Sequence, residues 1–274
     1  THFSGHLSHS MFSAICHTPF CPCIFALLSQ FREQPPRPSA LLFHGPPGTG
    51  KTTAARIAAQ EAGLPLVFAP LERLMSKWYG QGEQQLSALF EHSAALGGAI
   101  LFLDELDALA GSRSRELHEA SRRMLSVLLR RLDSVESESG AHDALIAATN
   151  RPQDLDDALL SRFDTRVLFP APQPEERAVI FGRYAMQLST TELASLGELA
   201  EGLTGRDILD VCRQAERSWV CTLLRHEGGD ADARFEAKPP PLEQYTRAVR
   251  SRQELANVNV TAPASDTHAG EGAG

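Results

Sequence analysis

An eight-residue glycine-rich segment constrains this 274-residue chain more than any other feature. It reads Gly-Pro-Pro-Gly-Thr-Gly-Lys-Thr over residues 45–52 and matches the pattern G-x-x-x-x-G-K-[ST] of a phosphate-binding loop. A short apolar run over 40–43 precedes it and a helical pattern over 52–62 follows it, which is the context that the pattern requires. The sequence therefore predicts a loop and a helix N-terminus that together bind the phosphates of a nucleotide.

The residue types of this loop fit that chemistry. Glycines allow unusual backbone angles and leave room for an anion to approach the backbone N–H groups. Lys51 would place a positive charge near the β- and γ-phosphates, and the Thr52 hydroxyl would bind Mg²⁺. The residues expected to contact the nucleotide are Gly45, Pro46, Pro47, Gly48, Thr49, Gly50, Lys51, Thr52 and Thr53. The alternative is a Gly- and Pro-rich turn that binds no ligand.

Short apolar runs alternate with longer amphipathic segments as far as residue 170. The apolar runs have the length of strands that are buried on both faces, and they cover 40–43, 66–69, 99–103, 144–148 and 166–169. The helical patterns between them cover 52–62, 84–96 and 117–132. This alternation predicts an α/β fold with a parallel sheet flanked by helices.

The pattern after residue 170 is entirely helical. It predicts helices over 175–188, 192–201, 206–225 and 242–255, and therefore a small all-α domain. We expect one apolar face of the third helix to pack in the core of that domain, through Ile208, Val211, Cys212, Ala215, Trp219 and Leu223. The expected organisation is an irregular N-terminal extension, a nucleotide-binding domain, a helical domain and a disordered tail, over 1–38, 39–170, 171–255 and 256–274.

Two acids follow the apolar run that ends at Leu103. Asp104 and Glu105 would emerge at the carboxyl end of a buried strand, where open α/β sheets bind their ligands. Asp104 is placed to hold Mg²⁺, and Glu105 is placed to orient and deprotonate an attacking water molecule. The phosphate loop earlier in the chain makes this pair a candidate catalytic site.

Composition excludes several classes of protein. With 26 Lys and Arg against 34 Asp and Glu, the net charge of −8 argues against a protein that coats nucleic acid. No apolar run is long enough to predict a membrane-spanning helix. Five cysteines, an odd number, favour a reducing, intracellular compartment, either the cytoplasm or an organellar matrix. The spacing of Cys16, Cys21 and Cys23 does not match a usual zinc site.

These features together resemble the AAA ATPases, a family within the wider AAA+ class of ring-forming motors. The resemblance covers about residues 36–250 and rests on the phosphate loop, the Asp104-Glu105 pair, and the segments Ala-Ala-Thr-Asn-Arg-Pro at 147–152 and Leu-Asp-Asp-Ala-Leu-Leu-Ser-Arg-Phe-Asp at 155–164. It implies a single ATPase module with a five-stranded parallel sheet and a helical lid. It also implies ATP and Mg²⁺ as ligands, a homo-oligomeric ring, expected to be a hexamer, and a polypeptide substrate.

The resemblance assigns roles to two further residues. Asn150 matches the polar sensor that contacts the γ-phosphate and the attacking water, although an ordinary turn residue is the alternative. Arg162 matches the arginine finger that reaches a neighbouring subunit's nucleotide. Relatives carry two adjacent arginines here, whereas this chain has Ser161 before Arg162, and we expect Arg166 to be a structural or solvated charge.

The family's pore loop corresponds to the segment that contains Lys77, Trp78, Tyr79 and Gly80. The two aromatic side chains would grip an extended polypeptide, and the alternative is that one of them packs under the helical domain. A second loop over 111–116 would also face the pore.

In the helical domain, Gly205 and Arg206 open the third helix, and Arg206 is a candidate nucleotide sensor or an ordinary solvent-facing arginine. The family's adenine-contacting segment before the phosphate loop has no counterpart in 1–30, so we expect a truncated or atypical N-terminus.

Three functions are consistent with these residues. The first is a Mg²⁺-dependent ATPase that forms a ring and remodels or unfolds proteins. The second is a nucleic-acid-remodelling protein of the helicase-loader type, against which the acidic charge and the aromatic loop count. The third is a nucleotide-binding scaffold with weak hydrolysis, since only one arginine finger is present.

Overall fold

A computed structural model describes residues 40–75, 81–110, 115–137, 144–226 and 238–261. The chain divides into two compact units, Thr1–Ala171 and Pro172–Gly274, and each is described by itself. None of the helices within the described ranges is long and apolar enough to cross a membrane.

The first unit is built around five parallel strands. The strands are β1 (Ala40–His44), β2 (Leu66–Pro70), β3 (Ile100–Asp104), β4 (Ala144–Thr149) and β5 (Thr165–Leu168). Their order in the sheet is β2-β3-β4-β1-β5, and every neighbouring pair is parallel. The predicted α/β class with a five-stranded parallel sheet is therefore confirmed.

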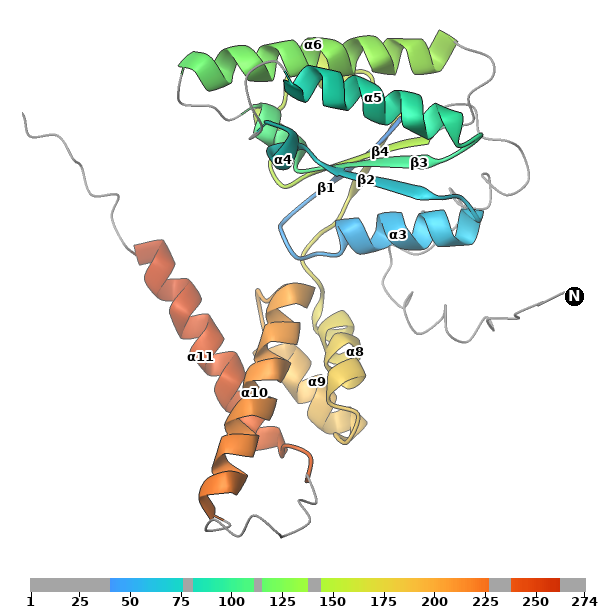
Figure 1. Cartoon of the computed structure of the whole chain (residues 1–274). Helices are drawn as coiled ribbons and strands as arrows, with labels where there is room; N and C mark the ends of the chain where they lie inside the picture. Colours follow the sequence, from blue (N-terminus) through green and yellow to red (C-terminus); the bar gives the residue numbers. More distant parts are fainter. Residues whose placement is uncertain (1–39, 76–80, 111–114, 138–143, 227–237, 262–274) are drawn as a thin grey trace, which may run out of the picture. The chain divides into compact units, whose positions relative to one another are not determined.

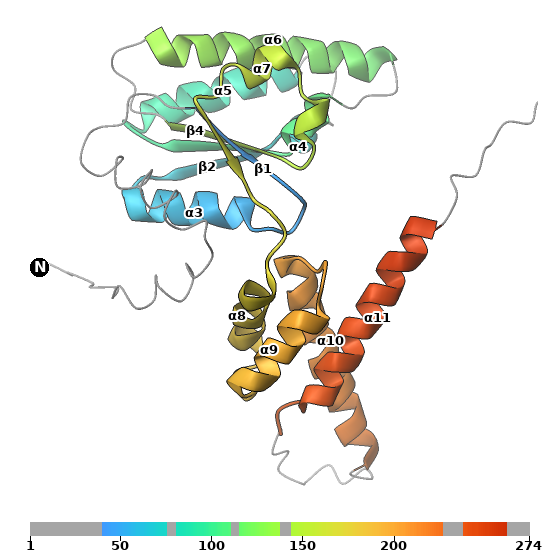
Figure 2. The ribbon, with the colours of Figure 1, turned by 180° about the vertical axis from the view of Figure 1, so that it is seen from behind.

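Helices cover both faces of this sheet. Figures 1 and 2 show α3 (Lys51–Ala62) on one face and α5 (Gln81–Ala95) and α6 (Arg115–Ser137) on the other. The described part of this unit also contains four short helices, namely α4 (Leu71–Met75), α7 (Asp157–Leu160) and the 3₁₀ helices η1 (Leu106–Leu109) and η2 (Pro152–Asp154).

Strands β1, β3 and β4 bury side chains on both faces, as their apolar runs predict, whereas β2 and β5 at the two edges of the sheet are mostly half-buried or exposed. On β1, Leu42 belongs to the core beneath α5 and α6, whereas Leu41 and Phe43 belong to the core beneath α3. On β3, Leu101 and Leu103 face the α5 and α6 side, and Phe102 faces the α3 side. This double burial fixes the carboxyl ends of the strands, where the candidate site residues lie.

The described residues of the second unit form four helices, α8 (Pro174–Tyr184), α9 (Thr190–Leu199), α10 (Gly205–His226) and α11 (Leu242–Thr261). Capping boxes begin α8, through Gln173 and Glu176, and α9, through Ser189 and Glu192. The core of this unit contains Phe181, Leu196, Ile208, Val211 and Tyr245 among its buried side chains.

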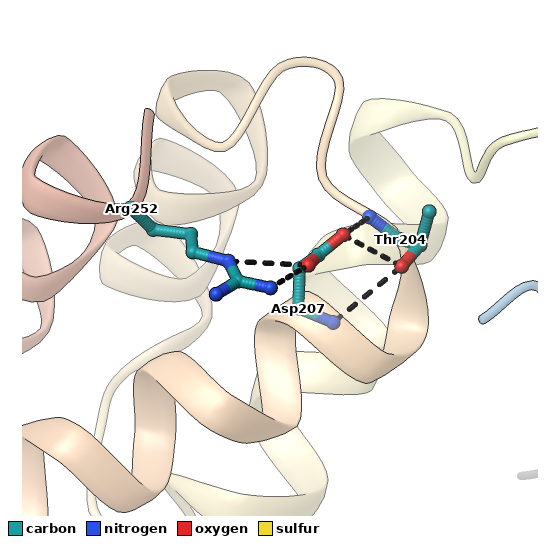
Figure 3. Close-up of polar contacts among 3 residues, drawn as sticks. All are labelled: Thr204, Asp207 and Arg252. Atoms are coloured by element: carbon teal, nitrogen blue, oxygen red, sulfur yellow. Dashed lines mark hydrogen bonds and ion pairs between the residues drawn. The ribbon is translucent and has the colours of Figure 1, made fainter. Parts of the chain in front are cut away.

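A polar cluster joins the start of α10 to α11 (Figure 3). One carboxylate oxygen of Asp207 accepts hydrogen bonds from the Thr204 backbone N–H at 3.0 Å and the Thr204 hydroxyl at 2.7 Å. The other oxygen accepts from Arg252 Nη2 at 2.5 Å and Nε at 3.2 Å. Asp207 therefore caps α10 and anchors α11 at the same time.

Two details of the helical unit differ from the sequence prediction. Trp219 is half-buried and donates its indole N–H to the Lys238 carbonyl at 2.7 Å, so the prediction that it packs in the core was wrong. The buried stripe of α10 ends at Ala215. Helix α11 runs to Thr261 rather than ending at Leu255, because no Gly or Pro interrupts residues 256–261.

Candidate nucleotide site

The glycine-rich loop joins β1 directly to α3. Gly45, Gly48 and Gly50 have φ values of 142°, 79° and 99°, which side chains with a Cβ rarely adopt. Gly45 also lies against the backbone of Phe169, whose carbonyl oxygen is 2.1 Å from where a Cβ at position 45 would stand. The loop thus has the glycines that its backbone path and its packing both require.

Lys51 lies at the start of α3 and points back into the loop. Its Nζ donates to the carbonyls of Gly45 and Pro46, each at 2.8 Å, and only 7% of the residue is exposed. Burial lowers the pKa of Lys51, while the carboxylates of Asp104 and Asp107 oppose that shift. The ammonium is therefore held beside the loop and the N-terminus of a twelve-residue helix, an arrangement suited to an anion.

Thr52 and Asp104 come together across the site. The Thr52 hydroxyl donates to Asp104 Oδ2 at 2.9 Å, although the two residues are 52 positions apart. A hydroxyl and a carboxylate are hard oxygen ligands of the kind that Mg²⁺ prefers. The residues that the sequence proposed as metal ligands therefore fit the ion chemically.

Glu105 follows Asp104 in a strained conformation. Its φ of 60° is positive, an uncommon conformation for a residue other than glycine, and its backbone N–H donates to Asp104 Oδ1 at 3.0 Å. Burial raises the pKa of Glu105, and the neighbouring Glu72 carboxyl, through a hydrogen bond and its charge, raises it further together with Asp104 and Asp107. A glutamate with these surroundings accepts a proton more readily than an exposed one.

Asn150, directly after β4, is tied to the acidic segment by a residue that the sequence analysis missed. Asp107 Oδ1 accepts hydrogen bonds from the Thr149 hydroxyl at 3.0 Å and from the Asn150 backbone N–H at 3.2 Å. The signal available in the sequence was an acid three positions after Asp104. That spacing alone also describes an ordinary solvated residue.

Arg162 binds an acid of its own chain. Its Nε and Nη2 donate to the two oxygens of Asp133 on α6, at 2.6 and 3.3 Å, and its Nη1 donates to the Ala158 carbonyl at 2.7 Å. Figure 2 shows α7, which ends just before Arg162, beside α6. Arg166 donates to the Leu160 carbonyl at 2.9 Å, which agrees with the structural role expected for it.

The remaining site predictions lie elsewhere. Lys77, Trp78, Tyr79 and Gly80 fall outside the described residues, as does most of the second loop over 111–116. Gly205 and Arg206 begin α10 in the second unit, so their roles toward the nucleotide stay predictions.

Comparisons with known proteins identify the first unit. The model of the family described as "ATPase family associated with various cellular activities (AAA)" matches residues 41–171. Spastin of Naegleria gruberi is 35% identical over 180 residues, and the outer mitochondrial transmembrane helix translocase of Danio rerio is 30% identical over 230 residues. These alignments cover 64% and 83% of this chain, but only 34% and 62% of the two relatives.

A solved structure gives the same result. The FIGL-1 AAA domain in complex with ADP is 28% identical and superimposes with a TM-score of 0.68, covering 81% of this chain and 77% of that one. This chain spans only about a third of the length of its first matched relatives. It covers 34% of the spastin above and 31% of fidgetin-like protein 1 of Caenorhabditis elegans. The predicted AAA family is confirmed for the first unit, because residues 41–171 match the family model and form an AAA ATPase domain.

Proposed function

We propose that this chain, through its AAA domain, hydrolyses ATP with Mg²⁺, assembles into a hexameric ring and uses the cycle to remodel polypeptides. The observation that carries the ATPase proposal is the contact between the Thr52 hydroxyl and the Asp104 carboxylate, beside the buried Lys51. It joins the phosphate loop to the end of β3 and offers two oxygen ligands for a metal ion. The similar FIGL-1 AAA domain, solved in complex with ADP, supports nucleotide binding by this chain.

The proposed binding step uses the loop and the two oxygen ligands. Lys51 and the backbone N–H groups of the loop bind the β- and γ-phosphates. Thr52 and Asp104 would hold Mg²⁺, which when bound supplies positive charge beside the phosphates. On the sequence alone, Gly205 and Arg206 are further proposed nucleotide contacts.

The proposed chemical step is attack of water on the γ-phosphorus. The water oxygen forms the new bond while its proton passes to the Glu105 carboxylate, and the bond to the β–γ bridging oxygen breaks, which leaves ADP and phosphate. Asn150 orients the water, and Arg162 of a neighbouring copy stabilises the charge on the transferred group. Because that arginine comes from another copy, turnover requires assembly.

The polypeptide substrate is supported by the sequence and by one relative's name. Lys77, Trp78, Tyr79 and Gly80 match the pore loop of protein-remodelling rings, with two aromatic side chains to pack against an extended chain. The translocase from Danio rerio is named for a transmembrane helix, which is itself a polypeptide. The net charge of −8 is unfavourable for a nucleic-acid substrate.

Phosphate release by the purified full chain tests the proposal. We expect turnover that requires ATP and Mg²⁺ and a specific activity that rises with protein concentration. Glu105→Gln should retain ATP binding and lose turnover, whereas the matched control Glu61→Gln, an exposed acid on α3, should behave as wild type. Capture of proteins by the Glu105→Gln variant in ATP would then identify substrates.

Each alternative has its own outcome in these assays. ATP binding without turnover at any concentration would indicate a nucleotide-binding scaffold and contradict the enzyme proposal. Salt-sensitive recovery of DNA or RNA in place of proteins would contradict the polypeptide substrate. Full hydrolysis by Glu105→Gln would refute the assignment of the base.

A further inference from the structure

The backbone at Asn150 lies just past the sheet. The β3–β4 ladder ends at the pair Leu103 and Ala147, and the β1–β4 ladder ends at His44 and Thr149. Asn150 therefore follows the last strand residue, where ladder hydrogen bonds no longer set the path of the chain. A side chain that must orient a water molecule needs its backbone fixed by other contacts.

Asp107 supplies those contacts through one oxygen. Its Oδ1 accepts from the Thr149 hydroxyl at 3.0 Å and from the Asn150 backbone N–H at 3.2 Å. The Thr149 hydroxyl in turn accepts from the Arg151 backbone N–H at 3.0 Å. Three consecutive residues centred on Asn150 are thus held directly or indirectly by a single carboxylate oxygen.

Asp107 is itself firmly placed. It lies on η1, whose Leu106 and Leu109 are buried in the core beneath α5 and α6. Glu105 is the N-cap residue directly before this short helix, and its backbone N–H is held by Asp104. Thr149 is only 1% exposed, so its hydrogen bond to a carboxylate forms in surroundings where charge-assisted bonds are strong. The proposed base and the proposed sensor are therefore attached to one rigid element.

We propose that Asp107 is a positioning residue that aims the Asn150 side chain by holding the backbone on both sides of it. This inference rests on the proposed ATPase function and adds a residue to it. The role depends on hydrogen-bond acceptance by Oδ1, not on the charge of Asp107. An asparagine at position 107 can still present an amide oxygen to both donors, whereas an alanine cannot.

Steady-state kinetics of four proteins test the coupling: wild type, Asp107→Ala, Asn150→Ala and the double variant. We expect each single substitution to lower kcat about tenfold to hundredfold, because a small misplacement of an orienting group has such an effect. The KM for ATP should change less than about threefold. In the double variant, kcat should match the lower of the two single variants within about twofold.

Asp107→Asn is the matched control, and it should keep kcat within about threefold of wild type. Multiplicative losses in the double variant would overturn the proposal, because the two residues would then act independently. An unchanged kcat in Asp107→Ala would also overturn the proposal, as would an equal loss of kcat in Asp107→Asn and Asp107→Ala.

A second measurement separates failure of this inference from failure of the proposed function. If wild type does not hydrolyse ATP, the function proposal fails, and the Asn150 backbone amide is then followed by NMR hydrogen exchange. Asp107→Ala should speed that exchange at least about tenfold, while Asp107→Asn should leave it near wild type. Equal exchange in all three proteins would refute the positioning role.

Discussion

Replacing Gly45 by alanine should destabilise the first unit more than replacing a glycine whose added Cβ would meet no other atom. The added Cβ would stand 2.1 Å from the Phe169 carbonyl oxygen and 2.9 Å from its carbonyl carbon. Both are backbone atoms of the chain that leaves β5, and the Phe169 N–H is already bonded to the His44 carbonyl at 2.7 Å. Neither side of the contact can move without breaking the edge of the sheet.

The magnitude follows from two additive costs. Overpacking at such a contact costs about 1–3 kcal/mol, and a φ of 142° in a residue with a Cβ costs about 1–3 kcal/mol more. The total is about 2–6 kcal/mol. Gly63→Ala is the matched control, because Gly63 has a φ of 67° but no atom within 4 Å of the added Cβ. Its expected cost is backbone strain alone, about 1–2 kcal/mol.

Hydrogen exchange of β1 and β4 peptides measures this difference, because those peptides report the opening of the first unit alone. We expect Gly45→Ala to raise the opening equilibrium by about 30-fold or more, and Gly63→Ala by about five- to thirtyfold, since about 1.4 kcal/mol corresponds to a factor of ten. If Gly45→Ala opens the sheet no more than Gly63→Ala does, the packing argument is refuted.

Three further predictions concern the helical unit. Buried Arg177 donates hydrogen bonds to the Gly197 and Pro172 carbonyls at 2.7 and 2.6 Å. Arg177→Leu removes both donors and should destabilise this unit by about 3 kcal/mol. An unchanged midpoint of denaturant unfolding would contradict this. Burial would raise the pKa of Asp207, but hydrogen bonds from Arg252 and Thr204 outweigh it and hold the pKa below its usual value. The stability that ionised Asp207 contributes is therefore present above about pH 4 and lost as pH falls through the folded-state pKa. The test uses a Trp78→Phe background, in which Trp219 is the only tryptophan. In that background, Asp207→Ala should have a clearly lower free energy of unfolding than its parent at pH 7, and this difference should shrink below about pH 4. A difference that does not change with pH would contradict the ion pair. Burial, with the Glu216 charge, raises the pKa of the Cys212 thiol to about 12, so maleimide mapping by mass spectrometry at pH 8 should modify exposed Cys221 and spare Cys212; rapid modification of Cys212 would be inconsistent with its burial.

The sequence predicted those parts of the fold whose cause is local. Strands β1, β3 and β4 each contain a continuous buried apolar run, and the loop before α3 is specified by glycines whose φ values only that residue type adopts readily. The pairing of Thr52 with Asp104 also follows from topology, because carboxyl ends of parallel strands meet at one edge of the sheet. Such features need no knowledge of distant side chains.

Trp219 shows where helical periodicity stops being informative. The spacing of Ile208, Val211, Cys212 and Ala215 continues to Trp219, yet the buried stripe ends at Ala215. The periodicity describes which side of α10 faces inward, but it does not state how far the neighbouring helices extend along it. Trp219 instead satisfies its indole N–H at the Lys238 carbonyl, a contact that no pattern within α10 could predict.

The residues that position the site were invisible for the same reason. Asp107 contacts Thr149 and Asn150 across 42 and 43 positions, and Asp133 contacts Arg162 across 29. In the sequence each is one acid among 34, and a solvated acid has the same local pattern. Residues that touch a phosphate are restricted to a few types at fixed spacing, because the ligand's chemistry selects them. Residues that hold them need only an oxygen in the right place, which many types and positions can supply. The groups proposed to touch ATP could therefore be found from the sequence, and the groups that orient them required the fold.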